Sequence, residues 1–81
     1  MKSSDILLSI GGGHRLEVFK VENFIAVLYE GAEIKDGLVL ATRYGTGLDF
    51  ESACDDYLSK IRGKRLVFNA CKENRHELIC L

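Results

Sequence analysis

The side chains best suited to hold a metal ion lie near the C-terminus, at Cys71, His76 and Cys80. Thiolates and imidazoles are preferred ligands of zinc, and a structural zinc site uses four of them in tetrahedral geometry. His14 would supply the fourth ligand if the glycine-rich segment around it lay beside the last strand. The Cys-x4-His-x3-Cys spacing, however, matches none of the common zinc motifs. We therefore predict free thiols, no metal site and no cofactor.

Catalytic chemistry is not indicated by the remaining nucleophiles and carboxylates. Cys54 falls on an apolar helical stripe, where a thiol is buried and unreactive. No pair of carboxylates lies near a histidine in a spacing that general acid-base catalysis requires. The glycines at 11–13 precede a strand rather than a helix, so they lack the helix N-terminus that a phosphate-binding loop needs. We predict that the protein is not an enzyme.

One concentration of basic residues runs from the middle of the chain toward its end: Lys60, Arg62, Lys64, Arg65, Lys72 and Arg75. Such a cluster could contact the phosphates of RNA or DNA. Lys60 and Arg62, however, are also what the C-terminus of a helix favours. Glu73 and Glu77 dilute the positive charge of the rest. A solvated face is the favoured interpretation, and a nucleic-acid-binding face is the alternative.

Length and composition predict one globular domain over residues 1–81. The chain is 47% hydrophobic and has a formal net charge of -1, so it lacks a general electrostatic attraction for nucleic acid. No apolar run approaches the length of a membrane span, and we expect no membrane partner. Three cysteines without a recognisable signal peptide are typical of a reducing compartment, which predicts a cytoplasmic protein.

The clearest predicted element is an amphipathic helix over residues 50–62. Asp49 is placed to cap its N-terminus, and Gly63 to end it. Glu51, Asp55, Ser59 and Lys60 are expected to face solvent. Six apolar residues recur at helical spacing and are expected to face a sheet: Phe50, Ala53, Cys54, Tyr57, Leu58 and Ile61.

The other elements read as strands. We expect frayed residues 1–5 and then a short edge strand at 6–10. Residues 15–21 and 24–29 predict a hairpin, and the second strand continues past Gly31 to Asp36-Gly37, a strong turn signal. Further strands are expected at 38–44, 64–69 and 77–81, with a turn at 45–47. The predicted fold class is α+β: an antiparallel β-meander with one amphipathic helix packed on one face, in the order β-β-β-α-β-β.

Residues 24–64 resemble the HicB-like family of small proteins, in which a meander runs into G-x-G-x-[DT]-x-E-x-A and an amphipathic helix. The matching positions are Gly45, Gly47, Asp49, Glu51 and Ala53. The R-G-K-R-L-V-F-N and K-E-N-R-H segments are also similar to those of short phage and prophage proteins of Gram-positive bacteria. The Pro-Asp-Leu-Pro-Gly-Cys stretch of HicB antitoxins is missing, and no DNA-binding motif follows. The resemblance therefore implies the fold and a phage origin, but neither toxin neutralisation nor operator binding.

These observations together favour a small phage or prophage protein that binds a macromolecule, as an inhibitor or accessory factor of a host protein. The alternatives are an RNA- or DNA-binding module that uses the basic face, and a protein that sequesters a small ligand. One helix of about 13 residues covers only part of a sheet, so apolar surface is left over. That surface would bind a protein partner or form a symmetric homodimer.

Overall fold

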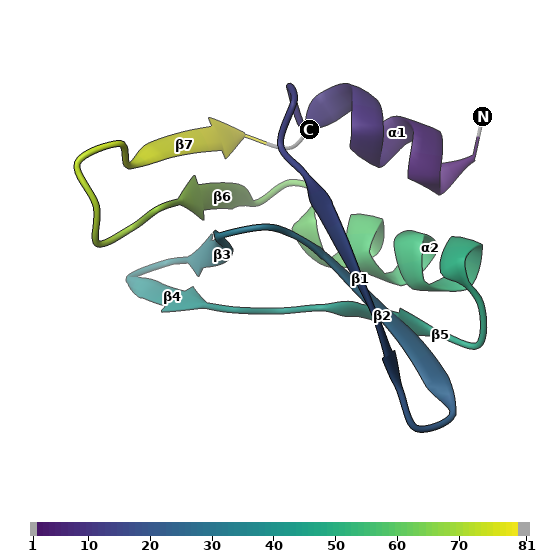
Figure 1. The fold of residues 1–81 in the computed structure, drawn as a ribbon. Helices are drawn as coiled ribbons and strands as arrows, with labels where there is room; N and C mark the ends of the chain where they lie inside the picture. Colours follow the sequence, from purple (N-terminus) through teal and green to yellow (C-terminus); the bar gives the residue numbers. More distant parts are fainter. Residues whose placement is uncertain (1, 80–81) are drawn as a thin grey trace.

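The computed structural model describes residues 2–79, which form two helices and seven strands. Figure 1 shows their arrangement. The α+β class is confirmed, whereas the predicted order with a single helix is wrong, because a helix also precedes the first strand. In chain order the elements are α1 (Ser3–Ile10), β1 (Leu16–Val21), β2 (Phe24–Tyr29), β3 (Ala32–Asp36), β4 (Val39–Ala41), β5 (Gly45–Gly47), α2 (Phe50–Ile61), β6 (Arg65–Phe68) and β7 (His76–Ile79).

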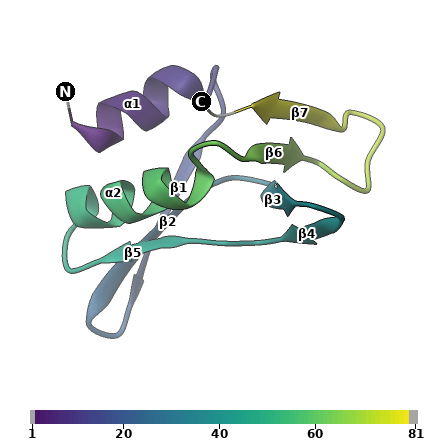
Figure 2. The ribbon, with the colours of Figure 1, turned by 180° about the vertical axis from the view of Figure 1, so that it is seen from behind.

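The strands form two antiparallel sheets instead of one meander. The first sheet has the order β1-β2-β5 and the second has the order β4-β3-β6-β7. The chain crosses from β2 to β3 at Gly31, whose φ of 75° favours glycine, and it returns through residues 42–44. The predicted strand 38–44 is thus only β4 and a connection, and the predicted turn at 45–47 is a strand, β5. Figures 1 and 2 show both helices on one face of the β1-β2-β5 sheet.

Helix α2 agrees closely with its prediction. The Asp49 side chain accepts a hydrogen bond of 2.8 Å from the Ser52 amide, and Gly63 has a φ of 77°. Five of the six predicted inward residues are buried: Ala53, Cys54, Tyr57, Leu58 and Ile61. Phe50 is the exception, because its side chain is 39% exposed. Phe50 precedes the point at which α2 meets β5 and therefore lies beyond the packed part of the helix.

Helix α1 replaces the predicted frayed residues and edge strand; Met1 lies outside the described residues. The Ser4 amide donates to a Glu51 carboxylate oxygen at 3.4 Å, and the Ser4 hydroxyl also donates to that carboxylate. A carboxylate at a helix N-terminus satisfies free amides and complements the helix dipole. An isolated helix of this length is marginal in water. Glu51, which stabilises α1, belongs to α2, so the local sequence pattern around residues 3–10 did not reveal this helix. The same contact explains why Glu51 is half-buried.

The core lies between the helices and the two sheets, since its buried cluster includes residues of β2 in the first sheet and of β3 and β6 in the second. Tyr29 donates its amide hydrogen to the Tyr57 hydroxyl at 3.2 Å, and its own hydroxyl donates to the Leu7 carbonyl oxygen. A Cβ atom at Gly45 would lie 2.2 Å from the Ala53 carbonyl oxygen, and one at Gly47 would lie 2.5 Å from the Ser52 Cβ. These two glycines therefore let β5 approach α2 closely. Within residues 2–79, neither helix is long and apolar enough to cross a membrane.

Candidate functional site

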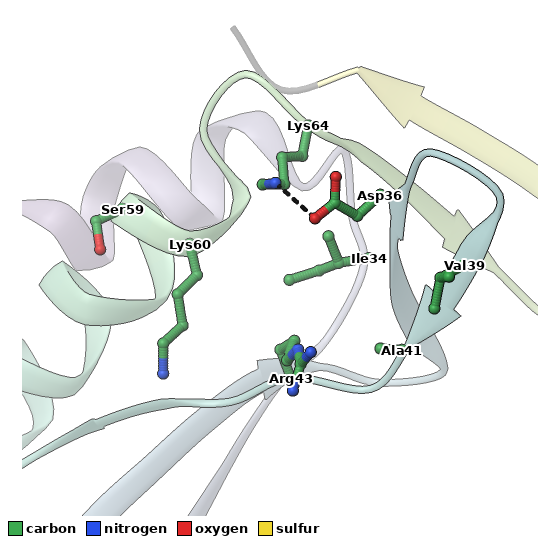
Figure 3. A pocket seen from close by; sticks show the side chains of 8 residues that line it. All are labelled: Ile34, Asp36, Val39, Ala41, Arg43, Ser59, Lys60 and Lys64. Carbon is green, nitrogen blue, oxygen red and sulfur yellow. Dashed lines mark ion pairs between the residues drawn. The ribbon is translucent and has the colours of Figure 1, made fainter.

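A groove with a volume of about 590 Å³ lies between the C-terminal half of α2 and the strands β3 and β4. Ile34 is buried and provides an apolar floor, and Val39 and Ala41 extend that floor along β4. Figure 3 shows the lining side chains, with Ile34 between the charged groups. An occupant of this groove would meet apolar side chains below and charged ones at the rim.

The rim of the groove is positively charged. It carries Arg43, Lys60 and Lys64 against one carboxylate, Asp36, which gives the lining a net charge of +2. Lys64 lies 3.1 Å from Asp36, the ion pair drawn in Figure 3. Arg43 forms no ion pair within residues 2–79. Sequence reasoning missed Arg43, because it lies far from the C-terminal basic cluster and only the return of the chain from β4 brings it beneath α2.

The six basic residues singled out in the sequence differ in their surroundings. Lys60 and Lys64 line the groove, whereas Arg65 and Arg75 both contact Glu77, at 3.2 and 3.6 Å. Of the six, only Arg62 and Lys72 form no ion pair with another residue in the 2–79 range. Carboxylates therefore neutralise much of the charge on which the nucleic-acid alternative depended.

Lys60 is held firmly at one wall of the groove. Its ammonium group lies 2.9 Å from the Asp56 carboxylate and donates to the Tyr44 carbonyl oxygen at 2.8 Å. Partial burial alone would raise the pKa of Asp56, but hydrogen bonds from Lys60 and from the Thr46 amide lower that pKa overall. Asp56 is thus ionised at neutral pH, and Lys60 has its charge already paired.

The structure brings together two of the four residues considered as metal ligands. The Nε2 atoms of His14 and His76 lie 2.7 Å apart, because the loop after α1 passes beside the start of β7. Burial, and then repulsion from His76, lowers the pKa of His14 below its ordinary value of 6.5. Cys71 is exposed, and Cys80 lies outside the described residues. Residues 2–79 contain no group of three or more histidine, cysteine, aspartate or glutamate side chains placed to hold a metal ion.

Cys54 lies in the core, as its place on the helical stripe predicted. Burial, reinforced by the charges of Glu51 and Asp55, raises the pKa of the Cys54 thiol to about 11. Thiols react as thiolates, and a thiol with this pKa is almost fully protonated at neutral pH. Cys54 is therefore a packing residue rather than a nucleophile.

The distal end of the β1-β2 hairpin exposes apolar side chains on one face. Phe19 is 43% exposed. The preceding residue, Val18, points to the opposite face and pairs with the buried Val27, nearer the middle of the hairpin. Val21 and its cross-strand partner Phe24 lie on the same face as Phe19, and both are also exposed. Figure 1 shows this end of the hairpin projecting beyond the helices. Among the described strands, none pairs with the outer edge of β1.

Comparison with known proteins does not identify the chain. No protein-family model matches it, and neither the curated proteins nor the solved structures contain a matching relative. The geometry of the groove, the histidine pair and the hairpin end is therefore the basis for a functional proposal.

Proposed function

We propose that this protein is a small, non-enzymatic phage or prophage protein that binds a host protein through the distal end of its β1-β2 hairpin. The observation that carries the proposal is the exposure of three apolar side chains on one face of that end, Phe19, Val21 and Phe24. The phage origin rests on the resemblance of the sequence alone. By covering part of the surface of the host protein, the bound chain would inhibit that protein or act as its accessory factor.

Contiguous apolar surface is the usual mark of a protein interface, and aromatic residues contribute strongly at its centre. An unpaired edge strand adds a row of backbone donors and acceptors that a partner strand can use. The hairpin end offers both features together. A second copy of the chain is the competing occupant, and the resulting homodimer is an outcome of the tests below.

Capture experiments with paired variants test the proposal. The Phe19→Lys and Val21→Lys variants each place a charge on the exposed apolar face of the hairpin end, and Leu38→Lys places one at a turn residue that is 101% exposed. Immobilised wild-type chain and Leu38→Lys should retain the same host protein, whereas each hairpin variant should lose at least about tenfold in affinity for it. Circular dichroism checks that all variants fold. Equal capture by all four chains would contradict the proposal.

Salt dependence separates this proposal from binding to nucleic acid. Phosphate contacts make affinity fall steeply between about 50 and 200 mM salt, whereas an apolar protein interface responds weakly. We expect the affinity for the host partner to change little over that range. A steep loss, together with sensitivity to Arg62→Gln and Lys72→Gln, would favour the nucleic-acid alternative instead.

The groove favours a second candidate function, the binding of a small anionic ligand with an apolar part. Such a ligand would meet Arg43, which has no ion pair within residues 2–79, next to the apolar floor formed by Ile34. Native mass spectrometry of protein purified from its host would show an added mass. Arg43→Gln should remove that mass, and Arg62→Gln, which lies outside the groove, should not. A spectrum of the bare chain would contradict this second function.

A further inference from the structure

His14 and His76 form a preorganised pair, although they are 62 positions apart in the chain. His14 stacks on Phe68, with ring centroids 3.7 Å apart and an interplanar angle of 12°. His76 lies nearly parallel to the same ring, with centroids 5.0 Å apart, and is the cross-strand partner of Phe68 in the β6-β7 ladder. One aromatic wall thus orients both imidazoles, and their Nε2 atoms meet beside it.

The hydrogen bonds determine which nitrogen atoms carry protons. His76 Nδ1 lies 3.1 Å from the Asn74 carbonyl oxygen, and a carbonyl can only accept, so Nδ1 is the protonated nitrogen of His76. Its Nε2 atom therefore presents a lone pair. The contact of 2.7 Å with His14 then requires His14 Nε2 to be the donor. A single proton is held between the two Nε2 atoms.

We propose that His14 and His76 bind one divalent transition-metal ion of the Zn²⁺ or Ni²⁺ class through their Nε2 atoms, with water as the remaining ligands. Imidazole is a preferred ligand of these ions. Metal-binding histidines almost always donate the other ring N–H to a carbonyl or carboxylate, which is what His76 does with Asn74. This inference goes beyond the proposed function, because the pair belongs to neither the hairpin end nor the groove.

Metal binding requires only a small rearrangement. Tetrahedral bonds of about 2.05 Å place two nitrogen ligands about 3.3 Å apart, so the Nε2 atoms must separate by roughly 0.6 Å. His14 follows Gly12 and Gly13, which have positive φ values, and a Cβ atom at either glycine would meet no described heavy atom within 4 Å, so the loop has room to shift. The shared proton moves from Nε2 to Nδ1 of His14 through solvent. The pair is neutral before and after, and no net proton is released.

Only two protein ligands are available at this place within residues 2–79, so the site is weaker than a closed four-ligand zinc site. Two ligands that supply about half the binding free energy of a four-ligand zinc site give a dissociation constant of about 1–200 μM. The bound ion would connect the loop after α1 to the start of β7. Because it binds the folded state, it would also raise the thermal midpoint.

Isothermal titration of the full chain with zinc chloride at about pH 7.5 tests the proposal. We expect one ion per chain, an affinity at least about tenfold lower in His14→Gln and in His76→Gln, and no change in the matched control Cys71→Ser. Zinc should raise the thermal midpoint of the wild type and of Cys71→Ser only. Undiminished binding in both histidine variants, or no heat at about millimolar zinc, would overturn the proposal.

X-ray absorption of the zinc-loaded wild type keeps the proposal testable if a histidine variant fails to fold. Zn–N and Zn–O distances of about 2.0–2.1 Å without sulfur are expected, whereas a Zn–S distance of about 2.3 Å would assign the ion to cysteine thiolates and overturn the proposal.

Discussion

The two ends of the β1-β2 hairpin have similar apolar composition and opposite surroundings. At one end, Tyr29 has no exposed surface, because its ring packs against Tyr57 of α2 and its hydroxyl donates to the Leu7 carbonyl oxygen of α1. Toward the other end, Phe19, Val21 and Phe24 share one face of the hairpin and remain exposed. Burial here is therefore decided by which elements reach the hairpin rather than by residue type. We infer that the covered end stabilises the fold and that the projecting end is available for recognition.

The largest effect is expected where β5 meets α2 at the covered end. Gly45→Ala would place a methyl group 2.2 Å from the Ala53 carbonyl oxygen, which is backbone and cannot move aside. We expect a destabilisation of about 3 kcal/mol or more, measured by urea unfolding. The matched control is Gly13→Ala, which meets no described atom within 4 Å and should cost about 1–2 kcal/mol through its positive φ alone. Equal losses would show that β5 does not pack closely on α2.

Two apolar residues of α2 give the next comparison. Leu58 is buried against the core, so Leu58→Ala should lower the free energy of unfolding by about 2–5 kcal/mol. Phe50 is part of the same stripe but lies beyond the packed region, so Phe50→Ala should cost about 0.5 kcal/mol. Denaturant unfolding of the two variants measures both values. A larger loss for Phe50→Ala than for Leu58→Ala would reverse the orientation of the helix.

The N-cap residue of α2, Asp49, should make the free energy of unfolding depend on pH in the acidic range. The hydrogen bonds from Ser52 lower the pKa of Asp49 below its ordinary value of 3.8. A carboxyl with a depressed folded pKa contributes stability above its unfolded pKa, and that contribution is lost as the pH falls through the lower folded pKa. Asp49→Asn keeps an acceptor but does not titrate. The free energy of unfolding, measured from pH 6 downward, should therefore fall less in Asp49→Asn than in the wild type. Parallel curves for the two chains would contradict the ionised cap.

The smallest effect on stability is expected at the projecting end. Phe19→Ser removes an exposed ring that lies outside the packed core, so the free energy of unfolding should change by about 0.5 kcal/mol or less. Light scattering of the same variant reports on self-association. A dimeric wild type that becomes monomeric in Phe19→Ser would assign the hairpin end to a homodimer rather than to a host protein.

Local patterns in the sequence were enough to predict α2, the first hairpin and the α+β class. Asp49, Gly63 and the apolar stripe act within the helix itself, so their meaning does not depend on distant residues. Helix α1 was missed because its N-terminus is stabilised by Glu51, which lies 47 positions away from Ser4. The role of Gly45 and Gly47 was missed for a similar reason. Glycine in a sequence indicates freedom of the backbone, but here it provides space for a neighbouring helix.

The candidate sites could be predicted only in part. The sequence identified the six basic residues, but their ion pairs, such as Arg65 with Glu77, form across the β6-β7 ladder and appear only once the register is known. Arg43 joins Lys60 and Lys64 only through the crossing between the two sheets. The approach of His14 to His76 likewise depends on where the loop after α1 lies.

Site-specific photo-crosslinking in host cells tests the central claim most directly. A photoreactive phenylalanine derivative would replace Phe19 in one chain and Leu38, a more exposed apolar residue of a turn, in another. We predict that the derivative at position 19 attaches the chain to one host protein and that the derivative at position 38 does not. Equal adducts from both positions, or adducts only between two copies of this chain, would contradict recognition of a host protein by the hairpin end.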